Sequence, residues 1–138
     1  MTGSRPRRKP ALPVSVLLVD DHPAVRRGLA LLLEAEGITV CGEASESAAA
    51  LQAIDQCRPD IALVDLSLGE EDGLCLVADL HDRVPCLVYS MYEDALHVEG
   101  AFKAGALGYV TKRELHRVLL EAIGEVAAGR RFVSPNAA

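Results

Sequence analysis

The sequence lacks several features that define large classes of protein. Its four cysteines (Cys41, Cys57, Cys75 and Cys86) form no CxxC pair and lie among apolar neighbours. This favours buried, reduced thiols over a zinc site or a disulfide framework, and so a reducing compartment. No run approaches the roughly 18 apolar residues of a membrane span, and the short apolar segment after the basic N-terminus ends in charge, which does not fit a signal peptide. We expect a cytoplasmic protein.

The chain also has little basic charge outside its first ten residues. Its formal net charge is −6, and removing Arg5, Arg7, Arg8 and Lys9 leaves about −10 for the remainder. Such a body is not expected to bind a nucleic-acid backbone, because counterion release requires a basic surface. We expect residues 1–13 to form a disordered basic tail, with a nucleic-acid or anionic-membrane contact as the minor alternative.

The length of 138 residues and a hydrophobic content of 50% are enough for one well-buried domain. We find no internal repeat. The predicted domain covers residues 14–130. Residues 131–138 are predicted to be a C-terminal linker stub, in which Ser134 and Pro135 form a turn out of the last helix.

Five short aliphatic and β-branched runs alternate with five helical patterns. The predicted strands are 14–19, 38–41, 61–64, 86–89 and 107–110, and the predicted helices are 23–36, 45–58, 73–82, 93–104 and 114–128. Helical spacing assigns one apolar face of each of four helices to the core. These faces consist of Val25, Leu29, Leu32 and Leu33; Ala48, Leu51, Ala53 and Ile54; Leu74, Val77 and Ala78; and Leu115, Val118, Leu119, Ala122, Ile123 and Val126. Strict alternation predicts a doubly wound (βα)5 fold, a three-layer α/β sandwich with a five-stranded parallel sheet. Its ligand site is expected at the carboxyl ends of the strands.

Acidic, hydroxyl and cationic side chains follow four of these strands. They are Asp20 and Asp21 after the first strand, Asp65 after the third, Ser90 after the fourth, and Thr111 and Lys112 after the fifth. Three carboxylates at one edge repel each other unless a hard cation such as Mg²⁺ joins them. Taken singly, Asp21 could be a helix N-cap and Lys112 a solvated charge, but their joint placement favours a magnesium and phosphate site.

The order of the motifs LLVDDHP, DIALVDLSLGEEDGL, VYSMYED and GALGYVTK resembles the receiver domain of two-component response regulators over residues 14–129. The sequence GYVTKREL resembles the subclass that precedes a LuxR/NarL-type helix-turn-helix. The resemblance implies a flavodoxin/CheY-like fold and a protein that accepts a phosphoryl group from a sensor histidine kinase. It also implies a phosphoacceptor that catalyses its own phosphorylation and dephosphorylation, not an enzyme acting on a separate substrate.

The resemblance also implies a role for each residue of the site. Asp65 is the expected phosphoacceptor, and Mg²⁺ is expected on Asp20, Asp21, Asp65 and the backbone carbonyl of Ser67. Lys112 and the Ser90 hydroxyl are expected to contact phosphoryl oxygens. Tyr109 is the expected switch aromatic, which moves with a surface made of the fourth helix, fifth strand and fifth helix. The simpler alternative for Tyr109 is a half-buried aromatic with a wet hydroxyl.

Several positions depart from the usual pattern of the family. Gly69 stands where proline is frequent, which predicts a more mobile acceptor loop. Met91 replaces a small residue and would narrow access to the site. Ser67 and Tyr92 occupy positions that tune dephosphorylation. Arg113, not proline, follows Lys112, so no cis-proline is expected there.

Partners follow from the same resemblance. Ala24, Val25 and Arg27 in the first helix are candidates for contact with the kinase. Phosphorylation could produce a homodimer, and DNA would be reached only through an output domain not in this chain; no membrane partner is expected.

Two other functions compete with the signalling switch. A degenerate receiver would act as a phosphorylation-independent docking module, which only Gly69 and Met91 support. An Mg²⁺-dependent phosphohydrolase would share the aspartyl-phosphate chemistry, but no second aspartate lies two residues after Asp65 to act as its acid and base.

Overall fold

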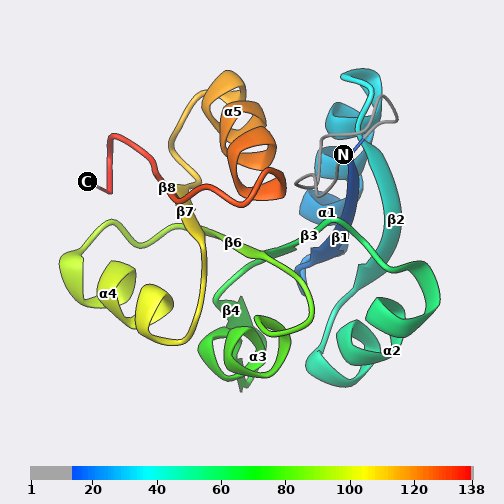
Figure 1. Ribbon diagram of the computed structural model, residues 1–138, viewed down its shortest axis with the longest axis horizontal. Coiled ribbons are helices and arrows are strands. Elements are labelled where there is room, and N and C mark those ends of the chain that lie inside the picture. Colours follow the sequence, from blue (N-terminus) through cyan, green and yellow to red (C-terminus); the bar gives the residue numbers. More distant parts are fainter. Residues whose placement is uncertain (1–13, 138) are drawn as a thin grey trace, which may run out of the picture.

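The protein is an α/β sandwich (Figure 1), seen here in a computed structural model that describes residues 14–137. The strands are β1 (Ser15–Val19), β2 (Thr39–Ala44), β3 (Ile61–Val64), β4 (Ser67–Leu68), β5 (Glu71–Asp72), β6 (Cys86–Ser90), β7 (Gly108–Thr111) and β8 (Phe132–Val133). The helices are α1 (Pro23–Ala35), α2 (Ser47–Cys57), α3 (Gly73–Leu80), α4 (Ala95–Lys103) and α5 (His116–Ala127).

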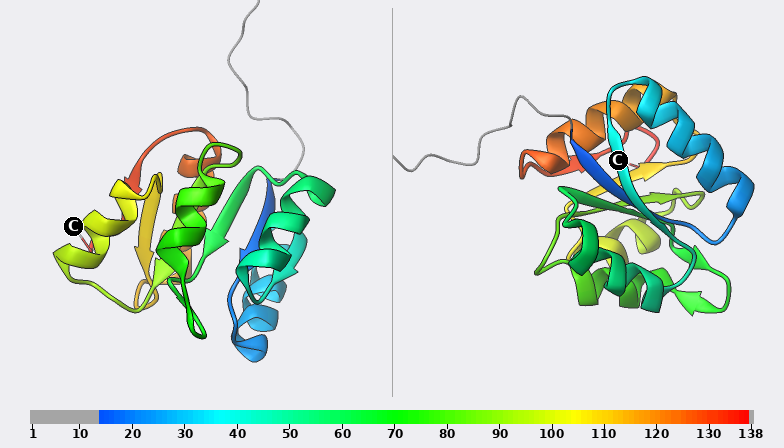
Figure 2. Two further views of the ribbon diagram at one scale, coloured as in Figure 1. Left: turned by 90° about the horizontal axis from the view of Figure 1, so that it is seen from below. Right: turned by 90° about the vertical axis from the view of Figure 1, so that its right-hand side faces the viewer.

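The main sheet is parallel, with strand order β2-β1-β3-β6-β7-β8. Helices α1 and α5 cover one face, and α2, α3 and α4 cover the other, as the edge-on view in Figure 2 shows. Every residue of β3 is buried, because helices shield both faces of this central strand. The predicted doubly wound, three-layer α/β fold is confirmed.

The direction of winding reverses at β1. The strand that follows it in sequence, β2, lies on one side, while β3 and the later strands lie on the other. The connections therefore diverge between the carboxyl ends of β1 and β3, which leaves a crevice there. Asp20 and Asp65 are the residues that follow these two strands.

The C-terminal residues differ from the prediction. Phe132 and Val133 form a sixth parallel strand, β8, on the outer edge of β7, and Ser134 is buried. The main sheet thus has six strands instead of five, and residues 131–137 are not a linker outside the domain. A two-residue strand is too short to produce a periodic pattern in the sequence, so this pairing went undetected. The predicted basic tail, residues 1–13, lies outside the described residues.

Most helix residues that were predicted to face inward do so. The fully buried ones are Leu33, Ile54, Val77, Leu119, Ala122, Ile123 and Val126. Val25, Ala48, Ala78 and Leu115 were also assigned to buried faces but are exposed. Ala48 is the second residue of α2, which begins at Ser47 and not near residue 45, and Leu115 is the N-cap of α5, so both lie at helix ends.

The loop after Asp65 is a hairpin. Strands β4 and β5 pair antiparallel through Leu68 and Glu71, which leaves a two-residue turn of Gly69 and Glu70. Gly69 has φ +61°, the conformation that a two-residue hairpin with glycine at its first position requires. Proline, with φ fixed near −65°, could not replace it. Gly69 thus occupies the first position of a hairpin turn, and the mobility expected of this loop stays a prediction.

No helix within residues 14–137 is long and apolar enough to cross a membrane. The same part of the chain has no cis peptide bond, in agreement with the absence of proline after Lys112.

Candidate functional site

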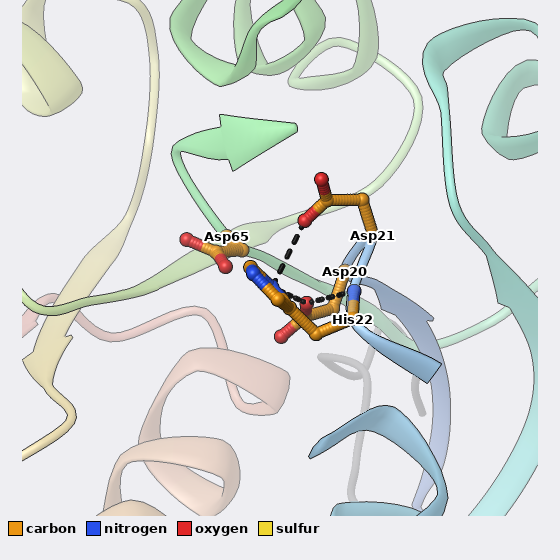
Figure 3. Close-up of side chains that lie close together, drawn as sticks. All are labelled: Asp20, Asp21, His22 and Asp65. Carbon is orange, nitrogen blue, oxygen red and sulfur yellow. Dashed lines mark hydrogen bonds and ion pairs between the residues drawn. The ribbon is translucent and has the colours of Figure 1, made fainter. Parts of the chain in front are cut away.

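Four side chains meet at the carboxyl ends of β1 and β3. One ligand atom from each of Asp20, Asp21, His22 and Asp65 lies within 4.8 Å of the others (Figure 3). Sheet hydrogen bonds continue into the site, since the Asp20 amide donates to Ala44 O at 3.0 Å and the Asp65 amide donates to Val19 O at 2.9 Å. Asp20 and Asp65 are both buried. The backbone thus fixes the two buried carboxylates in place.

Lys112 brings a positive charge to these carboxylates from β7. Its Nζ lies 3.0 Å from Asp65 Oδ2 and 3.4 Å from Asp20 Oδ2. The Lys112 amide donates to Ser90 O at 2.8 Å, which fixes the start of the side chain. Burial of the ammonium alone would lower the pKa of Lys112, but the hydrogen bonds and charges of Asp65 and Asp20 outweigh it and raise this pKa above its ordinary value.

Asp21 carries the feature that fits a bound cation. Its Oδ1 oxygen is buried and accepts no hydrogen bond within residues 14–137, although His22 Nδ1 lies 3.0 Å away. A buried carboxylate oxygen without a donor is costly unless another group compensates it. Carboxylate oxygens are also the ligands that Mg²⁺ prefers. Asp20, Asp21 and Asp65 therefore form a suitable cation site.

Two further side chains beside the acids, His22 and Arg26, were missed in the sequence. His22 Nδ1 is 3.1 Å from Asp20 Oδ1, and the His22 amide donates to the same oxygen at 2.9 Å. Arg26 donates to Asp20 O at 2.5 Å and pairs with Glu43 at 3.0 Å. The position of His22 directly after the acid pair was an available signal, whereas the contact of Arg26 with Glu43 depends on β2.

Gly73 explains how the acceptor loop passes close to α3. A Cβ atom there would lie 2.6 Å from Leu66 Cα and 2.7 Å from Asp65 O, both of which are backbone atoms. The Gly73 amide donates to Leu66 O at 3.0 Å. At the other end of the loop, the Ser67 amide donates to Asp65 Oδ1 at 3.1 Å. The loop is thus fixed on both sides of the Asp65 carboxylate.

Ser90 is the last residue of β6 and Tyr109 lies in β7, and both are buried. The Tyr92 amide donates to Ser90 Oγ at 3.1 Å, and the Tyr109 hydroxyl donates to Tyr92 O at 2.8 Å. Burial raises the pKa of Tyr109, and a hydrogen bond with Ser90 offsets only part of this effect. Tyr109 is therefore fully inward, which rules out the half-buried aromatic with a wet hydroxyl in this structure.

The other predicted site residues lie around the crevice. Met91 is 72% exposed, and the Tyr92 ring stacks on His97 of α4 with centroids 3.9 Å apart. Ala24, Val25 and Arg27 are exposed in the first turns of α1. The tuning roles of Ser67, Met91 and Tyr92 and the kinase contacts on α1 remain predictions.

The site can hold a hard cation and an anion side by side. Three carboxylates supply oxygen ligands, and Lys112 supplies positive charge 3.0 Å from the Asp65 carboxylate. A phosphoryl group coordinated to Mg²⁺ combines these two requirements.

Comparisons with curated proteins agree with this arrangement. The DNA-binding transcriptional activator DevR/DosR of Mycobacterium tuberculosis is 40% identical over 129 residues, which are 91% of this chain and 59% of that protein. The nitrate/nitrite response regulator protein NarL of Escherichia coli is 34% identical over 126 residues, 88% of this chain and 58% of that protein. The chain spans about three fifths of the length of these relatives.

Solved structures show the same fold. A LuxR-family two-component response regulator from an Aurantimonas species superposes with a TM-score of 0.85 at 34% identity, over 91% of this chain and 92% of that chain. The signal receiver domain of the putative response regulator NarL from Mycobacterium tuberculosis has a TM-score of 0.79 at 31% identity, over 86% of this chain and 99% of that chain.

A family model described as the response regulator receiver domain matches residues 16–124. Domains of this family generally bind Mg²⁺ at an acidic pocket, and the chain has an aspartate cluster there. The fold, the acids at the strand ends and the length of chain that the family model matches all agree. The chain belongs to the receiver domain family of two-component response regulators, of the LuxR/NarL type.

Proposed function

We propose that Asp65 accepts a phosphoryl group from a phosphohistidine of a sensor kinase. The observation that carries this proposal is the state of the Asp65 carboxylate. One oxygen pairs with Lys112 at 3.0 Å and the other accepts the Ser67 amide at 3.1 Å, within the cluster that contains Asp20 and Asp21. A carboxylate held in this way is oriented for attack and is accompanied by a cation that can stabilise the transferred group.

Asp20, Asp21, Asp65 and the backbone carbonyl of Ser67 are the residues that would hold Mg²⁺. When bound, the ion neutralises charge on the carboxylates and on phosphoryl oxygens. The buried Oδ1 oxygen of Asp21 supports this assignment, because it accepts no hydrogen bond in residues 14–137 and has only the His22 ring, at 3.0 Å, beside it.

In the proposed reaction, a carboxylate oxygen of Asp65 attacks phosphorus and the phosphorus–nitrogen bond of phosphohistidine breaks. The imidazole leaves with the electron pair of that bond. Lys112 pairs with an equatorial oxygen, and the Ser90 hydroxyl donates to another. The Tyr92 amide already donates to Ser90 Oγ, so the Ser90 hydroxyl would turn its hydrogen from Tyr109 to the phosphoryl oxygen. The same groups would assist water in the later hydrolysis of the acyl phosphate.

The response is proposed to be a change of the surface formed by α4, β7 and α5. After transfer, Asp65 gains about one further negative charge and three acceptor oxygens, which draw Ser90 and Lys112 toward the phosphoryl group. This shift of Ser90 would favour the inward position of the Tyr109 ring, which is already buried. We further propose kinase contact through Ala24, Val25 and Arg27, homodimer formation on phosphorylation, and transcriptional output through a DNA-binding domain beyond this chain.

Intact-mass measurement tests the acceptor. The wild type is incubated with acetyl phosphate, with Mg²⁺ or with excess chelator, beside Asp65→Asn and Asp79→Asn, which replaces an exposed aspartate of α3. We expect one phosphate-sized, hydroxylamine-labile increment in the wild type and in Asp79→Asn. It should need Mg²⁺ and be absent in Asp65→Asn. An undiminished increment in Asp65→Asn would refute the assignment, and no increment with any donor would favour a docking module.

A further inference from the structure

The C-terminal segment, defined here as residues 132–137, is bonded directly to the strand that carries the switch tyrosine. The Phe132 amide donates to Leu107 O at 3.2 Å, and the Ser134 amide donates to Tyr109 O at 2.9 Å. In the opposite direction, the Thr111 amide donates to the Ser134 hydroxyl at 3.2 Å. Three backbone groups, from Leu107 just before β7 to Thr111 at its end, therefore bond to this segment.

Val133 and Ala137 of the C-terminal segment lie on the same face of the sheet as Tyr109, whereas Phe132 packs on the opposite face. Tyr109 and Val133 are register partners in the parallel pair of β7 and β8, so both side chains point to the face that α4 covers. Val133 and Ala137 line a groove of about 380 Å³ with Val98 of α4, and Ala137 packs against the core cluster that contains Tyr109. In Figure 1, β8 lies beside β7, between α4 and α5.

Contacts outside the strand hold both ends of the segment. Arg131, which precedes it, stacks over the Phe102 ring of α4 at 4.0 Å. The Asn136 amide donates to Glu114 Oε2 at 2.8 Å, close to the start of α5. The segment thus contacts α4, β7 and the loop before α5, which together make the surface proposed to change on phosphorylation.

The Tyr109 ring lies on the side of β7 that faces β6. Its hydroxyl reaches Tyr92 O, just beyond the end of β6, so the ring leans toward β6. β7 lies between β6 and β8. A ring that turned away from β6 would turn toward β8, where Val133 lies. An outward ring would therefore lie on the side of β7 where Val133 is docked.

We propose that docking of the C-terminal segment on β7 is coupled to the inward position of Tyr109, so that phosphorylation of Asp65 tightens the segment and the segment in turn favours the phosphorylated state. The inference rests on the proposed function, since it needs Asp65 to carry the phosphoryl group. Coupling between two sites is reciprocal in binding free energy, so each half of the proposal can be measured separately. The partner of the switch surface is then a segment of this same chain.

Two measurements test the two halves of the proposal, both with Mg²⁺ and with beryllofluoride as the analogue of the phosphoryl group. Hydrogen exchange reports on the C-terminal segment, and fluorine NMR gives the Kd for beryllofluoride. In the wild type, beryllofluoride should slow amide exchange in residues 132–137 by about five-fold or more. Val133→Asp, which places a charge in the groove, should raise the Kd for beryllofluoride by a similar factor. Leu31→Asp, an equally charged change at an exposed position of α1, should leave the Kd within about two-fold.

Ser134→Ala provides a second variant in case Val133→Asp unfolds. It removes only the acceptor of the Thr111 amide and should change the Kd in the same direction by less. Suppose that beryllofluoride binding requires Mg²⁺ and Asp65. Unchanged or faster exchange in residues 132–137, or unchanged Kd values in both variants, would then overturn the coupling and leave the proposed function intact. No beryllofluoride binding at all would overturn the proposed function and the inference with it.

Discussion

Lys112 Nζ lies 3.0 Å from Asp65 Oδ2 and so joins the ends of β7 and β3, two strands that β6 separates in the sheet. The same ammonium is 3.4 Å from Asp20 Oδ2, at the end of β1. One side chain therefore compensates two buried carboxylates on different strands. Removal of the Lys112 side chain should therefore change the free energy of unfolding, the affinity for Mg²⁺ and the rate of phosphorylation to different degrees.

Lys112→Ala should lower the free energy of unfolding by about 3 kcal/mol without metal, because two buried carboxylates lose their cation. Mg²⁺ should restore part of this loss and bind at least as tightly as in the wild type, since a competing positive charge is gone. Phosphorylation by acetyl phosphate should fall strongly. Urea unfolding with and without Mg²⁺, and intact-mass kinetics, measure these effects. Lys103→Ala, at an exposed position of α4, is the control, and weaker Mg²⁺ binding with normal phosphorylation would contradict the assigned role.

Gly73→Ala should destabilise the protein by about 3 kcal/mol and slow phosphorylation. Its Cβ would lie 2.6–2.8 Å from backbone atoms of Asp65 and Leu66, which cannot move without displacing the acceptor loop. Gly124→Ala in α5 is the matched control, because no atom lies within 4 Å of the added Cβ. It should stabilise the helix by about 0.5–1 kcal/mol. Equal stability of the two variants in thermal unfolding would disprove the close approach.

Alkaline titration should reveal the buried phenols. Burial raises the pKa of Tyr109 and of Tyr89 above their ordinary value near 10. The stability due to each raised pKa is fully present below the ordinary value and is lost as the pH rises through the folded-state pKa. Wild-type stability should therefore fall above about pH 10, and less steeply in Tyr109→Phe.

Absorbance of tyrosinate provides the direct measurement. Tyr109→Phe should remove one late ionisation and leave that of Tyr89, and Tyr89→Phe should do the reverse. If the double variant kept the same late steps as the wild type, neither tyrosine could be their source.

Thiol labelling should distinguish the cysteines by the rate at which each one reacts. Burial raises the pKa of Cys86 to about 12, and burial together with a hydrogen bond from the Cys57 thiol to Cys41 raises the pKa of Cys57 to about 12. Because the thiolate is the nucleophile, iodoacetamide at pH 8 should modify the exposed Cys75 first and Cys57 and Cys86 only slowly. Peptide mass spectrometry gives the order, and labelling in urea should abolish it. Modification of Cys57 as fast as Cys75 in the folded protein would contradict this order.

Much of the fold and the core of the site followed from the sequence. Alternating aliphatic and helical patterns predict a parallel doubly wound sheet, because only helices on both faces can bury such strands. The acids at the ends of β1 and β3 and the lysine after β7 could be placed at one edge for the same reason. The structure brings Asp20, Asp21, Asp65 and Lys112 together as expected.

Other features depended on contacts between residues that are far apart in the chain. The Arg26–Glu43 pair, the β8–β7 pairing and the inward ring of Tyr109 each require a partner from another element, and local periodicity contains no record of that partner. The hairpin turn at Gly69 likewise needed a positive φ that residue type permits but does not require. The sequence by itself determined the order and kind of the elements, because these depend on short-range patterns of apolar residues. Only the tertiary structure decided which side chains face one another and what covers the edge of β7, because packing between distant segments selects among alternatives that are locally equivalent.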